Sequence, residues 1–278
     1  MQEGHALLGI PLFCLGELPA ARIHLERGDN LSWRAILLWH LGYLDQAQQT
    51  MHGALAKQLP NVWQRAFVLM AASTLSQLRR DWPVAQQRAD NLMKLATEHD
   101  LPLLGAQGSL LHGRALVALG QEAEGIEQIT RGLAAYLATG AEAWRPMYLG
   151  MLAASYAHAG QATEGLRQVN KALQIVEATQ ERWWEPELYR LRGVLLLEVS
   201  SDHHAETVSS FHQAITIARR QHAKSWELRA AMSLARLWQQ QGKQARARKL
   251  LAGVYDGFTE GFGTADLQAA KTLLEGLS

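Results

Sequence analysis

A repeated spacing of small residues constrains the fold of this chain more than any other feature. The segments "HGRALVALGQEAEGIEQITRGLAA" and "LAASYAHAGQATEGLRQVNKALQ" carry small residues at the same offsets of 7, 5 and 7, with the two copies 40 residues apart. These positions are Gly113, Gly120, Gly125 and Gly132 in the first copy, and Ala153, Gly160, Gly165 and Ala172 in the second. Small side chains let two antiparallel helices approach closely, and glycine supplies the backbone freedom that a helix end needs. The spacing therefore predicts stacked helix pairs.

The same spacing, applied to the whole chain, predicts seven helix pairs. The first helices carry their small residue at Gly9, Ala35, Ser73, Gly113, Ala153, Gly193 and Ala235. The turns inside the pairs are predicted near Gly16, Gly42, Arg80, Gly120, Gly160, Ser200 and Gly242. Only 26 residues separate the first two units, so we expect residues 1–60 to be irregular or shortened, 61–257 to form regular units, and 264–278 to form a capping helix. With seven prolines and no alternating β-branched segment, the whole chain is expected to be helical.

The spacing resembles that of the tetratricopeptide repeat, although the period is about 40 residues here against 34 in the simple repeat. Tyr156 and Phe211 stand where that family places its aromatic residues. The resemblance implies an all-α, right-handed superhelical solenoid of about six to seven antiparallel helix pairs, closed by a C-terminal capping helix.

A closer resemblance is carried by "RWWEPELYRLRGVLLL" and "AITIARRQHAKSWELRAAMSLARLWQQQGK". These runs are similar to the repeat region that follows an ATPase module in bacterial adenylate or guanylate cyclases and in related multidomain transcriptional regulators. The chain has no glycine-rich phosphate loop followed by Lys and Ser or Thr. The resemblance therefore implies the regulatory repeat region alone, as an independent protein or as part of a larger one.

Tryptophans recur at a fixed place in three successive units. Trp144, Trp184 and Trp226 each lie nine residues before the small position of a first helix. Stacked repeats must bury one face against the next, so these residues are predicted to pack units together. The small positions Gly113, Ala153, Gly193 and Ala235 are assigned the same structural role. Trp183 has no counterpart in the other units, and it is predicted either to cover a neighbouring loop or to stand exposed as a contact residue.

The first helices of such a solenoid line a concave groove. The residues predicted to bind a partner there are Arg114, Trp183, Glu187, Arg190, Val194, Arg229, Met232 and Arg236. Arginine pairs bidentately with carboxylates, so the expected partner is a peptide with apolar anchors and acidic neighbours, or an ATPase or cyclase domain of the same protein. The alternative is that these arginines are merely solvated helix formers.

Composition and motifs disfavour most other functions. The net charge of +1 requires neither nucleic acid nor a membrane, and the basic residues between Arg219 and Lys249 are spread over several helical faces. No catalytic residue, metal site or cofactor is predicted, because the chain has a single cysteine, Cys14, no serine elbow and no paired metal-binding histidines. That cysteine count, with no export signal recognised, indicates the cytoplasm. The function predicted is a non-catalytic protein-interaction and regulatory module; the alternatives are a small-ligand sensor and a nucleic-acid-binding solenoid.

Overall fold

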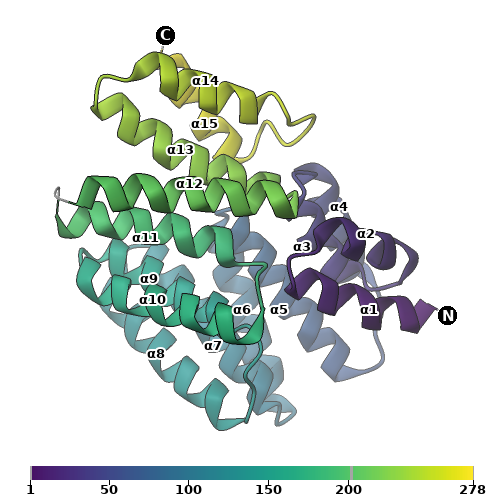
Figure 1. Ribbon diagram of the computed structural model, residues 1–278. Helices are drawn as coiled ribbons and strands as arrows, with labels where there is room; N and C mark the ends of the chain where they lie inside the picture. The colour runs from purple at the N-terminus through teal and green to yellow at the C-terminus, as the bar shows by residue number, and fades with distance from the viewer. Residues whose placement is uncertain (1, 201–202, 278) are drawn as a thin grey trace.

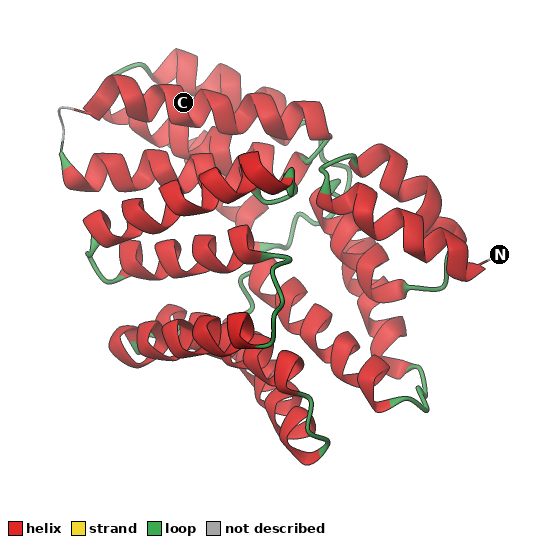
Figure 2. Cartoon of the chain, turned by 60° about the horizontal axis from the view of Figure 1, so that its bottom comes forward, coloured by secondary structure: helices red, strands yellow, loops and turns green. Residues whose placement is uncertain are grey.

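The computed structural model describes residues 2–200 and 203–277, and these residues form fifteen α-helices and no strand (Figure 1). Short connections join the helices (Figure 2). The helices are α1 (Gln2–Cys14), α2 (Leu18–Arg27), α3 (Leu31–His40), α4 (Leu44–Ala56), α5 (Val62–Leu78), α6 (Trp82–Glu98), α7 (Pro102–Ala118), α8 (Glu122–Ala138), α9 (Arg145–His158), α10 (Ala162–Thr179), α11 (Glu185–Val199), α12 (His204–Gln221), α13 (Lys224–Gln240), α14 (Gln244–Tyr255) and α15 (Ala265–Glu275).

The helices pack as seven consecutive pairs, from α1 with α2 to α13 with α14, and α15 packs against the last pair. This arrangement confirms the predicted all-α stack of helix pairs with a terminal helix. The four N-terminal helices have 10 to 13 residues each, whereas α5 to α8 have 17 each.

The turns inside the pairs have a left-handed backbone at six of the seven predicted positions. The positive φ angles are 82° at Gly16, 88° at Gly42, 62° at Arg80, 90° at Gly120, 68° at Gly160 and 73° at Gly242. The seventh position, Ser200, is extended at φ −162°. Arg80 is the one residue of the six that is not glycine, and it adopts a conformation that is costly for a side chain with a Cβ atom.

Small residues bring the two helices of a pair into close contact. A Cβ atom added to Gly113 would lie 2.8 Å from the carbonyl oxygen of Gly125, so α7 and α8 touch through their backbones. At Gly193 an added Cβ atom would lie 2.5 Å from the ring of Phe211 on α12. Ala153 and Ala235 are fully buried. A larger side chain at any of these places would force two helices apart.

Six of the seven first helices form a ring. Each of α3, α5, α7, α9 and α11 contacts the next first helix along the chain, and α13 returns to contact α3. The Ser225 hydroxyl of α13 donates a hydrogen bond to the carbonyl oxygen of Trp39 at the end of α3. The surface predicted to be a concave groove is therefore the interior of this ring, where a cavity opens to solvent.

An aromatic cluster forms where the ring closes. The ring centroids of Trp39 and Trp226 lie 4.9 Å apart, as do those of Trp184 and Trp226, and Phe13 of α1 lies 5.0 Å from Trp183. Aromatic pairs favour centroid distances in this range, and the rings are oriented edge-to-face in the two tryptophan pairs and tilted in the Phe13–Trp183 pair. Two of the three tryptophans at the repeated position thus touch each other. The third, Trp144, packs on Trp33 instead, at 5.5 Å.

The prediction that Trp183 could be an exposed contact residue is wrong, because its side chain is only 2% exposed. Its side chain packs against Phe13 of α1 and against Trp33 and His40 of α3. The backbone N–H groups of Arg182 and Trp183 both donate to the carbonyl oxygen of Cys14, at 2.8 and 3.2 Å. Met232 is also 2% exposed and lies in the core, so its assignment to the groove surface is wrong too.

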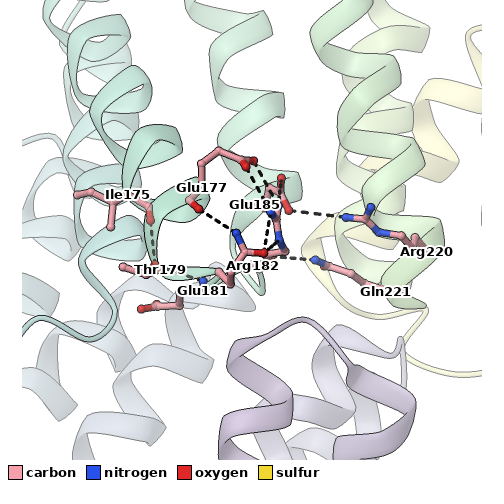
Figure 3. Close-up of polar contacts among 9 residues, drawn as sticks. Ile175, Glu177, Thr179, Glu181, Arg182, Glu185, Arg220 and Gln221 are labelled. Carbon is pink, nitrogen blue, oxygen red and sulfur yellow. Dashed lines mark hydrogen bonds and ion pairs between the residues drawn. The ribbon is translucent and has the colours of Figure 1, made fainter.

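Arg182, the neighbour of Trp183, forms a set of polar contacts with residues of adjacent helices (Figure 3). Its guanidinium pairs with Glu185 at 2.9 Å and with Glu177 at 3.4 Å, and its carbonyl oxygen accepts a hydrogen bond from Gln221. Gln221 ends α12, so residues of α10, α11 and α12 meet at this arginine. Arg182 and Gln221 also line a pocket together with residues 15–17, the turn between α1 and α2.

Candidate functional site

The interior of the ring contains a cavity of about 410 Å³ that is lined by residues of α5, α7, α9, α11 and α13 and of the turn between α5 and α6. It adjoins a smaller cavity of about 60 Å³. Alanine, leucine and valine side chains form much of the wall, and four arginines supply its charge: Arg80, Arg114, Arg190 and Arg229.

Five of the eight residues predicted to bind a partner line this cavity: Arg114, Glu187, Arg190, Val194 and Arg229. They meet there because each first helix turns the same face to the interior of the ring. Trp183 and Met232 are buried elsewhere, and Arg236 is exposed and does not line the cavity.

Sequence reasoning missed two lining residues: Arg80, in the turn between α5 and α6, and Trp82, the first residue of α6. A signal was present, since Arg80 occupies a turn position that holds glycine in five other units.

Arg229 is neutralised by Asp266 from the first turn of α15. Its Nε donates to Asp266 Oδ2 at 2.7 Å, and Arg80 Nε lies 2.9 Å from the other carboxylate oxygen. The Arg229 guanidinium also donates to the carbonyl oxygen of Leu78 and lies about 5 Å from the ring centroids of Trp39 and Trp226. Both arginines are therefore held by one carboxylate, and Arg229 joins the cavity to the aromatic cluster.

Arg190 is neutralised by Glu187, one turn earlier on α11. Its Nε and Nη2 donate to the two carboxylate oxygens at 2.7 Å each, which is the bidentate geometry that arginine and carboxylate favour. Glu187 is buried, so this pair forms part of the cavity wall.

Arg114 forms no ion pair with any residue that the structure describes. Its guanidinium stacks on Trp82, 4.8 Å from the ring centroid, and its Nη1 is buried with no hydrogen-bond partner in the described residues. Burial lowers the pKa of Arg114 to about 10; nearby Glu187 opposes this shift, and the charges of Arg80 and Arg229 add to it. The group still carries its proton at neutral pH.

Burial also raises the pKa of Glu198, which lines the same cavity. Four arginines and two carboxyl groups, Glu187 and Glu198, line the cavity, which gives it an excess of positive charge. Arg114 is the lining arginine without an ion pair to a described residue.

A second and more apolar cavity of about 540 Å³ lies between the N-terminal pairs and α5. Ile10, Leu31, Trp63 and Phe67 are among its lining residues, and Trp63 is 45% exposed. No sequence pattern marked this place, because it is formed by residues from separate units.

The described residues contain no group of three or more histidine, cysteine or acidic side chains placed to hold a metal ion. Burial and the charge of Glu181 raise the pKa of the Cys14 thiol to about 12, so this group stays protonated. Within the described part of the chain, no helix is long and apolar enough to cross a membrane.

The fold defines an all-α helical-repeat protein. The chain is similar over 99% of its length to the crystal structure of the apo form of RapI, of which 99% is covered, with a TM-score of 0.59 and 11% sequence identity. At this identity the similarity concerns the fold alone. No protein-family model and no curated protein matches the chain.

Proposed function

We propose that this protein is a non-catalytic regulatory module that binds a short segment of a partner protein inside its helix ring. The observation that supports this function is the 410 Å³ cavity, whose size falls within the 300–1,000 Å³ of ligand-binding pockets and whose wall combines charged and apolar side chains. A space of this size holds a few residues of a peptide rather than a folded domain.

The proposed context is a signalling ATPase, a cyclase or a transcription regulator, of which this chain is the sensor or scaffold arm or a stand-alone equivalent. The resemblance of the runs from Ala178 onward to cyclase-associated repeats supports this assignment. The single cysteine supports a cytoplasmic location.

The test is a selection of short peptides and a capture of partners with three forms of the full chain: the wild type, Ala154→Trp and Arg167→Glu. Ala154 lines the cavity, so tryptophan there is expected to fill it and to reduce capture at least tenfold. Arg167 lies on the outer helix α10 and is exposed, so its reversal is the matched control and should leave capture unchanged. Equal capture by Ala154→Trp and the wild type, with both folded, would contradict binding inside the ring.

A small-molecule sensor is the second candidate function, and the apolar cavity beside Trp63 favours it. A thermal-shift screen of apolar compounds tests this function, because a ligand that binds only the folded form raises the melting temperature. The shift should disappear in Trp63→Ala if the compound binds there.

A further inference from the structure

Arg114 is a partly buried cation that forms no ion pair with the described residues of the chain. The other three cavity arginines are held by two carboxylates, with Arg190 on Glu187, and Arg80 and Arg229 on Asp266. An arginine that lines a cavity without a carboxylate partner is suited to a ligand that supplies the missing negative charge.

The guanidinium of Arg114 lines both cavities. Trp82 covers one face of the guanidinium, and Nη1 is buried without a hydrogen-bond partner in the described residues. The adjoining smaller cavity is lined by both Arg114 and Trp184, and the Nε1–H group of Trp184 is a second buried donor without a partner.

The indole of Trp184 packs directly against α9 at Gly150. A Cβ atom added to Gly150 would lie 2.8 Å from Trp184 Nε1, so the missing side chain is what lets the indole approach this closely. Its Nε1 is thereby buried, which leaves Arg114 as the donor that can bind an anion in the cavity.

We propose that Arg114 binds one carboxylate group of the peptide segment that the ring takes up. Four arginines face Glu187, Glu198 and Asp266, which leaves an excess of one positive charge and suits a carboxylate rather than a doubly charged phosphate. The wall formed by Ala154, Ala157 and Val194 then contacts an apolar neighbour of the acidic group.

The peptide partner rests on the proposed function, whereas the carboxylate site can be tested without any peptide. The probe is sodium acetate, added at constant ionic strength against sodium chloride to the full chain. The side-chain Nε–H resonance of Arg114, assigned by its loss in Arg114→Gln, is expected to shift saturably with acetate. The Nε–H of Arg167, exposed and already paired with Glu164, should not follow it. If the Arg114 resonance does not move, or if the Arg114 and Arg167 resonances shift equally, the carboxylate site is wrong. Peptide binding would then still be tested separately by the selection experiment.

The carboxylate of a peptide can come from its C-terminus or from an Asp or Glu side chain. Peptides selected by the wild type are therefore measured by calorimetry as free acids, as C-terminal amides, and with each acidic residue replaced by its amide. The peptide form that lacks the bound carboxylate should have at least tenfold weaker affinity. That form shows whether the carboxylate comes from the C-terminus or from a particular side chain.

Arg114→Gln should weaken the affinity for the carboxylate-bearing peptide at least tenfold. Its effect on the affinity for the peptide that lacks this carboxylate should be small. Arg114→Lys, which keeps the charge but not the planar fork, should lie between the two. If affinity stays within twofold after every carboxylate is removed, the proposed site is wrong although peptide binding stands. If no peptide binds at all, the proposed function fails as well.

Discussion

Trp183 shows what the spacing of residues could and could not reveal. The ladder of Trp144, Trp184 and Trp226 was visible because it repeats along the chain, whereas Trp183 has no equivalent. Its packing depends on Phe13, 170 residues earlier, and on His40. Contacts between units so far apart leave no periodic trace in the sequence.

We expect Trp183→Ala to lower the free energy of unfolding by about 3–5 kcal/mol, since it removes a fully buried aromatic side chain. Denaturant titration measures this loss. The matched control is Trp63→Ala, whose side chain is 45% exposed and should change stability far less. Equal losses in the two variants would show that Trp183 is not buried in the folded chain.

His40 makes stability depend on pH. Burial, together with the charge of Arg229, lowers the pKa of His40 to about 3, although the hydrogen bond from its Nδ1–H to the Ile36 carbonyl opposes the shift. The unfolded chain takes up this proton near pH 6.5 and the folded chain does not, so the contribution is complete above pH 6.5 and is lost as the pH falls toward 3.

The expected loss is about 1.4 kcal/mol per pH unit, or about 2 kcal/mol between pH 6.5 and 5. His40→Phe keeps an aromatic ring and removes the titration. Unfolding curves of the wild type and this variant should therefore diverge below pH 6.5. Parallel pH profiles would mean that His40 becomes protonated in the folded protein.

At the scale of helices, the repeat located every pair and every turn inside a pair, because five of the seven turns carry glycine at a left-handed position. It also placed Arg114, Glu187 and Arg190 on one surface, since residues at fixed offsets share a helix face. It could not locate Arg80, which reaches the site from the turn after α5, or Trp82, which is the first residue of the second helix α6.

The start of α4 is capped from the other end of the chain. Glu260, in the connection between α14 and α15, accepts hydrogen bonds from the backbone N–H groups of Asp45 and Gln46 at 2.9 and 3.0 Å. These bonds lower the pKa of Glu260 against the effect of its partial burial. The cap therefore links the N-terminal pairs to the last helix.

Glu260→Ala should cost about 1 kcal/mol of unfolding free energy, as for the loss of other N-terminal caps. Because the pKa of Glu260 is lowered, this contribution is present at neutral pH and is lost in acid. Glu275→Ala, an exposed acid at the end of α15, is the control. Thermal unfolding at pH 7 should separate the two variants, and identical melting temperatures would contradict a capping role.

At the scale of the whole molecule, closure of the ring changes how the repeats unfold. In an open solenoid each repeat contacts only its neighbours, and damage stays local. Here α3 contacts α13, and Phe13 of α1 packs on Trp183 before α11.

Phe13→Ala is therefore expected to speed amide hydrogen exchange in α11 and α13 as well as in α1 and α2. Hydrogen-exchange mass spectrometry measures this spread. Leu267→Ala truncates a buried side chain of α15 and is a useful comparison. It should speed exchange from the other side of the α3–α13 contact, because α15 packs against α13. If exchange increased only in α1 and α2 after Phe13→Ala, the first helix pair would unfold independently of the ring, which would contradict this expectation.

The contact between α3 and α13 also fixes how many helix pairs the ring contains. An open stack of repeats can gain or lose a unit at an end without breaking a contact elsewhere. In this ring, one more or one fewer helix pair between α3 and α13 would separate these two helices and expose the aromatic rings of Trp39 and Trp226 that lie between them. Closure thus sets the number of pairs from α3 to α13, whereas α1 is not one of the helices that form the ring.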